Sequence, residues 1–247
     1  MRSNPIQWYL TALQNCPYIG GREMQTVLAD PAASLGARRY GRLLAEGFRR
    51  SGRFVYRHQC PSCSACVAIR LPVTRFQPDR SQRRCLRRNA DLELRIAAAP
   101  DIDEHMALFQ RYLLARHPGG GMDSLSRDDY ADMLNDRHCD VFLIECRLGG
   151  NLVCVAVTDA TPDGLSAMYT FFDPDQAVRG LGSYAILLQI AETLRRGLPH
   201  LYLGYWIPDS PKMAYKTRFR PCEGLLGGLW RPLATPPTRG RTTVTPC

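Results

Sequence analysis

The chain has 247 residues, of which 45% are hydrophobic and 22% are charged, and its formal net charge is +9. This length and composition are those of a globular protein with one large domain or two small ones, so a core is expected. No apolar run approaches the roughly 20 residues that a membrane helix needs, and polar residues interrupt the N-terminal apolar stretch. We therefore expect neither an anchor nor a signal peptide, and a cytoplasmic protein.

The first 90 residues predict short strands around one helix. In chain order the predicted elements are a strand pair around 6–12 and 22–30, a helix from about Leu35 to Arg50 closed by Gly52, strands at 53–58 and 67–73, and a short helix at 81–88.

Basic residues are concentrated in this N-terminal part. Between Arg38 and Arg95 there are 15 arginines and four acidic residues. A GC-rich genome would explain the scarcity of lysine, but it would not explain the clustering. The clustering favours a polyanionic partner, most simply a nucleic acid, over a merely solvated basic face.

Three cysteines at intervals of three residues, Cys60, Cys63 and Cys66, suit zinc or an iron-sulfur cluster, which bind thiolates in short loops. A tetrahedral site needs a fourth ligand, for which Cys16, His58 and Cys85 are candidates. The alternative is a compact turn of buried thiols. In both cases we expect a structural role, and most of the other cysteines should be reduced core thiols.

The helix predicted at 81–88 carries four arginines, and Arg83 lies one turn from Arg87, as Arg84 does from Arg88. Like charges at this spacing repel each other, so a phosphate backbone that relieves the repulsion is expected to bind there. Arginine suits phosphate because its planar guanidinium offers two parallel donors. The alternative is a solvated helix face.

From residue 91 the hydrophobic pattern gives strands and helices in the order β-α-α-β-β-β-α-β-α-β. The predicted elements are a strand at 91–99, a helix at 101–117, a helix at 126–136 with Ser126 as N-cap, a hairpin at 139–159 turning at Gly149 and Gly150, a strand at 164–172, a helix at 181–197, a strand at 200–206, a short helix at 211–219 and a last strand at 224–230.

This order is that of the GCN5-related acetyltransferase fold, an α/β fold with a mixed sheet and helices on both faces. Acyl donors bind there at the N-terminus of the long helix, whose free N–H groups attract anions. Gly180 and Gly182 supply the glycines of that loop, but Ala177 stands where glutamine or arginine is usual. Coenzyme A is therefore not predicted.

Residues 201–221 combine tyrosines with both lysines of the chain, Lys212 and Lys216. Strand alternation would place Tyr202 and Tyr205 on opposite faces, whereas Lys212, Tyr215 and Lys216 would share one helix face. Two lysines one turn apart in a chain that otherwise uses arginine suit an anionic ligand, although a plain surface charge is the alternative.

Long composite stretches of the chain resemble the bacterial aspartate/glutamate leucyltransferases, relatives of the eukaryotic arginyl-tRNA-protein transferases. The resemblance runs from about Ile6 to Trp230. It is carried by CPYIGGREMQT, GFRRSGRFVYRHQCPSCSACVAIRLPV, SQRRCLRRN, YLLARHPGGGM, VAVTDATPDGLSAMYTFFDP, RGLGSYAILLQI and LYLGYWIPDSPKMAYKTRFRP.

The resemblance implies transfer of leucine from leucyl-tRNA to the α-amine of proteins that begin with Asp or Glu, in the N-degron (N-end rule) pathway of protein degradation. It also implies a cysteine-bearing domain at 1–90 and an acetyltransferase-like domain at 91–230. The residues from 231 to 247 read as a disordered tail, because they are rich in proline and threonine without apolar periodicity.

The resemblance bears on the cysteines as well, since the eukaryotic relatives link theirs to iron-sulfur or haem binding. Cys16 matches the first cysteine of their N-terminal pair, but Ile19 occupies the second place. Since only Cys16 of that pair is present, we expect it to be the fourth member of the cluster of Cys60, Cys63 and Cys66. No cofactor is expected to be required for the transfer itself.

Position and chemistry suggest two sets of site residues. The expected transfer centre comprises Tyr169, Tyr205, Lys212, Tyr215, Lys216 and Arg218, and the expected tRNA-binding residues are Arg83, Arg84, Arg87 and Arg88. Two alternatives stay open from sequence alone. They are arginine as the transferred residue, and a non-catalytic RNA-binding module.

Overall fold

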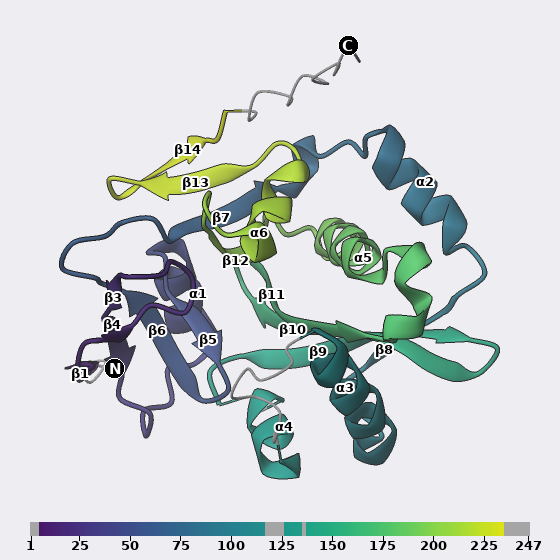
Figure 1. Cartoon of the computed structure of the whole chain (residues 1–247), viewed down its shortest axis with the longest axis horizontal. Helices are drawn as coiled ribbons and strands as arrows, with labels where there is room; N and C mark the ends of the chain where they lie inside the picture. Colours follow the sequence, from purple (N-terminus) through teal and green to yellow (C-terminus); the bar gives the residue numbers. More distant parts are fainter. Residues whose placement is uncertain (1–4, 117–125, 135–136, 235–247) are drawn as a thin grey trace, which may run out of the picture.

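A computed structural model describes residues 5–116, 126–134 and 137–234, without the side chains of Pro211 and Lys212. The fold is a mixed α/β arrangement around one large sheet, with a smaller sheet beside it (Figure 1). Within the described residues, no helix is both long and apolar enough to cross a membrane.

The large sheet has eight strands in the order β14-β13-β7-β12-β11-β10-β9-β8. Their bounds are β7 Val67–Pro72, β8 Glu93–Ala97, β9 Asp140–Leu148, β10 Asn151–Thr161, β11 Gly164–Phe172, β12 His200–Trp206, β13 Glu223–Leu226 and β14 Leu229–Pro232. Among these neighbours only β11 and β12 pair in parallel. The others are antiparallel.

Helices cover both faces of this sheet because its central strands are apolar on both sides. On one face lie α2 (Arg80–Arg88) and α5 (Leu181–Arg195), and Leu181 and Leu187 pack with Leu165. On the other face lie α3 (Ile102–Arg116) and α4 (Arg127–Met133), and Phe109 packs with Phe171. Alternate residues of β9 and β10 serve the two clusters.

The smaller sheet is built from the N-terminal part, in the order β1-β4-β6-β5. It comprises β1 Trp8–Leu10, β4 Thr26–Ala29, β5 Arg49–Ser51 and β6 Phe54–His58, with α1 (Ala37–Ala45) beside it and a separate pair, β2 Gln14–Asn15 and β3 Glu23–Met24. Tyr40 and Leu44 of α1 share a buried cluster with Tyr202 of β12, so the two sheets are packed together.

A buried ion pair fixes the junction between the sheets. Arg50 of β5 donates to both carboxylate oxygens of Asp159 on β10, over 2.5 and 3.0 Å, and both side chains are 0% exposed. The Tyr40 hydroxyl donates to the same carboxylate over 2.8 Å. The Arg50 guanidinium also donates to the carbonyl of Met133 at the end of α4. Four elements therefore meet at one satisfied charge pair.

The predicted elements occur in the predicted order, including the Ser126 cap of α4, but β2, β3 and β5 were not predicted as separate strands and three further features differ. The helix expected to run to Arg50 ends at Ala45, because Gly47 takes a φ of 90° and turns the chain into β5. The last strand is a hairpin, because Gly227 and Gly228 have positive φ. Residues 231 and 232 extend β14 into the segment expected to be disordered.

The expected boundary at residue 90 does not separate the two sheets. Strand β7 comes from the first 90 residues, yet it lies between β12 and β13 in the large sheet. Helix α2 packs against α5 in the same body. The N-terminal part therefore contributes both the small sheet and an internal strand of the large one.

Replacing Asp159 by asparagine is expected to lower the free energy of unfolding by about 3–5 kcal/mol, because it leaves the Arg50 charge buried without a partner. Urea-induced unfolding measures this. The matched control is Asp132→Asn in the exposed pair of Arg53 and Asp132, whose side chains are 52% and 47% exposed. That pair should contribute under about 1 kcal/mol. Equal losses in the two variants would contradict the assignment.

Candidate functional site

The two parallel strands separate after a short pairing. Strand β11 pairs with β12 only from Gly164 to Ser166, opposite His200 to Tyr202. Beyond this point β12 carries a bulge at Gly204, which has a φ of 77°. In open α/β sheets, ligands bind outside the carboxyl ends of strands where the strand order reverses, and we take the divergence of β11 and β12 as the comparable position here. The candidate site is therefore the region where β11 and β12 diverge.

The bulge also changes which tyrosines share a face. Strand alternation predicted opposite faces for Tyr202 and Tyr205, and this was wrong. The guanidinium carbon of Arg49 lies 5.5 Å from the ring centre of Tyr202 and 5.6 Å from that of Tyr205. Strand β12 has one extra residue opposite β7, and this bulge places both tyrosine rings on the same side of the sheet.

Arg49, on β5, is a buried cation at the centre of this arrangement. It is 4% exposed and donates to the carbonyls of Leu44, Phe48, Ile69 and Gly204. Its Nε atom is buried and has no hydrogen-bond partner within the described residues. Burial lowers the pKa of the guanidinium. The sequence did not single out Arg49, which looked like one more member of an arginine-rich segment.

Lys216 approaches the same bulge from the other side. It lies in a 3-10 turn, η3 (Tyr215–Arg218), which follows α6 (Pro211–Ala214). Its Nζ atom donates to the carbonyl of Tyr205 over 2.9 Å. Burial, and then the charge of Arg49, lower the pKa of Lys216 to about 8. A lysine in this state exchanges protons near neutral pH.

The remaining residues expected in the transfer centre lie in two groups. The Tyr205 hydroxyl is buried and donates to the carbonyl of Gly47 over 2.8 Å, so it braces β12 against the N-terminal part. Tyr169 lies on β11, with its ring 5.5 Å from that of Phe109 and 6.5 Å from that of Tyr112 on α3. Its hydroxyl is buried without a hydrogen-bond partner among the described residues.

Tyr215 is 39% exposed, and burial of its hydroxyl, and then the neighbouring Tyr112, raise its pKa. Tyr169 and Tyr215 therefore both adjoin Tyr112, on the α3 side of the site. Arg218 has an exposed side chain, and its carbonyl accepts from Gln82 of α2 over 3.2 Å. The expected common face of Lys212, Tyr215 and Lys216 cannot be followed as a whole, because the side chain of Lys212 lies outside the described residues.

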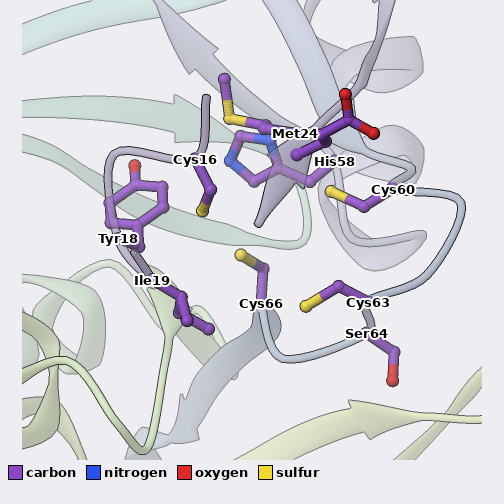
Figure 2. A pocket seen from close by; sticks show the side chains of 10 residues that line it. Cys16, Tyr18, Ile19, Met24, His58, Cys60, Cys63, Ser64 and Cys66 are labelled. Carbon is purple, nitrogen blue, oxygen red and sulfur yellow. The ribbon is translucent and has the colours of Figure 1, made fainter. Parts of the chain in front are cut away.

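The cysteines lie in a separate pocket beside the small sheet. It encloses about 30 Å³ and is lined by Cys16, Tyr18, Ile19, Glu23, Met24, His58, Cys60, Cys63, Ser64 and Cys66. Figure 2 shows the sulfur atoms of the four cysteines around one common space, with the His58 ring beside it. Cys16 thus lines the same pocket as Cys60, Cys63 and Cys66, and its expected role as the fourth ligand of a metal stays a prediction.

The pocket does not have the geometry of a formed metal centre. Among the described residues, no three His, Cys, Asp or Glu side chains are grouped closely enough to hold a metal ion. Burial, and then the neighbouring thiols, raise the pKa of Cys66 to about 12, whereas the backbone N–H of Ala65 lowers the pKa of Cys63. Thiolate donors suit zinc or an iron-sulfur cluster, so metal binding stays a prediction. We assign no step of the chemistry to it.

His58 connects this pocket to the site at the bulge. Its ring centre lies 5.0 Å from that of Tyr205 and 5.4 Å from that of Tyr56. Nδ1 lies 3.2 Å from the Thr26 hydroxyl, and burial lowers the pKa of the ring. The imidazole is therefore expected to be neutral at pH 7, and it links the cysteine pocket to Tyr205 by packing.

The four arginines expected to bind tRNA, Arg83, Arg84, Arg87 and Arg88, are all exposed on α2, as is a fifth, Arg80. An Asp79 capping box begins the helix, and Asn89 after its end donates to the carbonyl of Arg179 over 3.0 Å. The Cys85 thiol contacts the carbonyl of Gly180, where α5 begins. A basic helix face thus stands next to the loop that leads from β11 into α5, on the side of the molecule shown at the upper right of Figure 1.

Lys216→Met is expected to raise the free energy of unfolding at pH 7 by about 2 kcal/mol, after allowance for one lost hydrogen bond. The folded chain binds the lysine proton more weakly than the unfolded chain, so Lys216 costs stability below pH 8. The gain should fall between pH 8 and the ordinary lysine value of 10.5, and disappear above it. Urea unfolding at several pH values measures it. Arg218→Met, with its exposed charge, should show no such pH dependence, and a parallel dependence in both variants would refute the assignment.

The family models and the curated relatives that match this chain point to one protein family. The family model described as the N terminus of arginine-tRNA-protein transferase matches residues 14–84, and the model of its C terminus matches residues 104–226. The chain is 51% identical to the aspartate/glutamate leucyltransferase of Gluconacetobacter diazotrophicus, over 93% of this chain and 88% of that protein. It is 47% identical to the protein of the same name from Thiobacillus denitrificans, over 92% and 95% of the two chains.

Among solved structures, the L-PGS structure from Bacillus licheniformis is similar with a TM-score of 0.45 and 10% identity, covering 57% of this chain and 45% of that one. The two family models together span most of both sheets and the diverging strands. The chain therefore belongs to the arginine-tRNA-protein transferase family.

Proposed function

We propose that this chain transfers leucine from leucyl-tRNA to the α-amine of proteins that begin with Asp or Glu, a labelling step of the N-end rule degradation pathway. The observation that carries the proposal is the likeness to aspartate/glutamate leucyltransferases along nine-tenths of the chain. The transferred residue follows those relatives, so leucine takes precedence over arginine.

We further propose that the large sheet is acetyltransferase-like. The order of its elements supports this, as do the parallel pair that diverges and the long helix α5 that follows β11. In this arrangement the activated acyl group and the acceptor amine would meet where β11 and β12 separate. The side chains available there are those of Tyr169 from β11, Lys216 from η3 and Tyr215 beside it.

The chemistry asks little of the protein, because the aminoacyl ester is already activated. The neutral α-amine attacks the ester carbonyl, a tetrahedral oxyanion forms, the amine loses a proton, and the ribose hydroxyl leaves with one. An α-amino group has a pKa of about 7.7–8.0, so a sufficient fraction is neutral at pH 7 without a strong base. Tyr169 offers a buried hydroxyl that no described residue engages, and we propose that it donates to the oxyanion.

Arginines of α2 supply the grip on tRNA in this proposal. They are exposed on one helix, and that helix adjoins the start of α5. Phosphates contacted there would hold the acceptor end of the tRNA near the diverging strands. This proposal places the tRNA phosphates at α2 and leaves Arg49 and Lys216, near Tyr205, for a smaller anion.

The purified chain is expected to transfer radiolabelled leucine from leucyl-tRNA to peptides that begin with Asp or Glu, and not to matched peptides that begin with Lys or Ala. Arginyl-tRNA serves as the matched donor. Transfer of arginine instead of leucine would move the chain to the related activity. Transfer of neither, with RNA binding intact, would support a binding module.

Replacing Arg84 and Arg87 together by glutamine is expected to raise KM for leucyl-tRNA about tenfold or more while the kcat for transfer stays near that of the unmodified chain. Each lost phosphate contact should also reduce the slope of log affinity against log salt by roughly 0.7–0.9. Filter binding across salt concentrations measures the slope. The control is Arg195→Gln on α5, which is already paired with Glu192. An unchanged salt slope in the double variant would remove α2 from the tRNA site.

A further inference from the structure

A buried cation, Arg49, and a half-buried one, Lys216, approach one bulge of β12 from different elements. Arg49 Nη2 donates to the carbonyl of Gly204 over 3.4 Å, and Lys216 Nζ donates to the next carbonyl, that of Tyr205, over 2.9 Å. A side-chain carbon added to Gly204 would lie 3.4 Å from Lys216 Nζ. The two positive groups are therefore held one peptide apart by backbone geometry that only a glycine with a φ of 77° supplies at this place.

Within the part of the chain that the structure describes, this pair has no counter-ion. No carboxylate of the described residues forms an ion pair with Arg49 or Lys216, and after burial the groups that influence the Arg49 pKa are tyrosines. The next residue shows the contrast, because Arg50 is equally buried and has Asp159 as its partner. A buried charge without a carboxylate partner is costly, so a site that places a second, half-buried cation beside buried Arg49 favours an anion there.

Hydrogen-bond capacity remains at both groups. Four donor contacts of Arg49 end on carbonyls, but Nε–H has no partner within the described part of the chain. Lys216 uses one of its three N–H groups on a described acceptor. Tyr202 and Tyr205 cover the guanidinium. The donors that remain are therefore few, namely Arg49 Nε–H and the other N–H groups of Lys216. They suit a carboxylate, whereas the paired guanidinium donors that a phosphate would need are already used on carbonyls.

We propose that Arg49 and Lys216 form the subsite that holds the side-chain carboxylate of the acceptor's first residue, with Lys216 as the direct contact and Arg49 as the positioning residue behind it. This inference rests on the proposed function. It explains how one subsite binds both Asp and Glu. The lysine ammonium is a compact charge on a flexible side chain, so it can donate to a carboxylate from more than one direction.

The location supports an acceptor rather than the tRNA. The bulge is covered by the small sheet, since Tyr205 donates to Gly47 and packs on His58. The exposed arginines that suit a phosphate backbone lie on α2, on the opposite face of the large sheet. Lys216 is half-buried, so a single side chain can approach it, whereas an extended phosphate backbone needs an open surface.

The two lysines of the chain make a direct test possible. In protein labelled with ¹³C at lysine Cε, NMR reports two lysine signals, which Lys212→Arg assigns. The pKa of Lys216 is expected to lie near 8 in the free protein, to rise on addition of a peptide beginning with Asp, and to stay unchanged with the matched Asn peptide. Equal shifts with both peptides, or none with either, would overturn the proposal. A rise with inorganic phosphate or a tRNA acceptor minihelix, but not with the Asp peptide, would assign the subsite to phosphate instead.

Kinetics provide the second test. Lys216→Met is expected to lower the preference for Asp over Asn peptides, as a ratio of kcat/KM, on the order of 30-fold through KM for the acceptor. KM for leucyl-tRNA should be unchanged, Lys216→Arg should recover part of the preference, and Arg195→Met should behave as wild type. A loss in kcat with the acid preference intact would make Lys216 part of the reacting centre and refute the subsite.

The proposed function and the subsite fail in different ways. If the wild-type chain does not transfer leucine, the proposed function fails, whatever the variants do. If the wild-type chain transfers leucine with acid selectivity and Lys216→Met retains that selectivity, only the subsite fails. Because Lys216→Met is expected to be more stable than wild type, its unfolding curve separates a loss of recognition from a loss of folding.

Discussion

Divergence of β11 from β12 after three residue pairs is the constraint on which the candidate site depends. A fully paired sheet would satisfy its backbone groups internally and would close the region between the strands. Here the bulge at Gly204 turns the carbonyls of Gly204 and Tyr205 toward cations from β5 and η3. In place of further pairing with β11, this part of β12 therefore contacts β5 and η3, which are far apart in sequence.

Two neighbouring arginines of β5 are both buried but have different partners. Arg50 is fully paired and holds the small sheet to β10. Among the described residues Arg49 donates hydrogen bonds only to carbonyls, so no carboxylate neutralises its charge. Adjacent residues of a strand point to opposite sides. Strand β5 can therefore direct Arg50 toward Asp159 and Arg49 toward the bulge of β12.

Most of the fold could be predicted from the sequence, because long segments such as 102–116 and 181–195 have strong periodicity and marked ends. The site could be predicted only in part. Lys216 and Tyr205 stood out by residue type, and Cys16 lines the same pocket as the cysteines with which it was grouped. Arg49 could not be distinguished among 15 arginines, since its burial arises from packing between segments distant in the chain. The face of Tyr205 was wrong because a bulge cannot be read from alternation.

Strand β7 has a consequence for the order in which the molecule can be assembled. It is synthesised early, but both of its neighbours in the sheet, β12 and β13, lie more than 120 residues later in the chain. Such long-range pairing is slow, and unpaired strand edges attract other chains until it is complete. On the ribosome, the apolar residues of β7 must wait until almost the whole protein has emerged. The first 90 residues are therefore not an independent folding unit, and the chain has to close its sheet as one of its last steps.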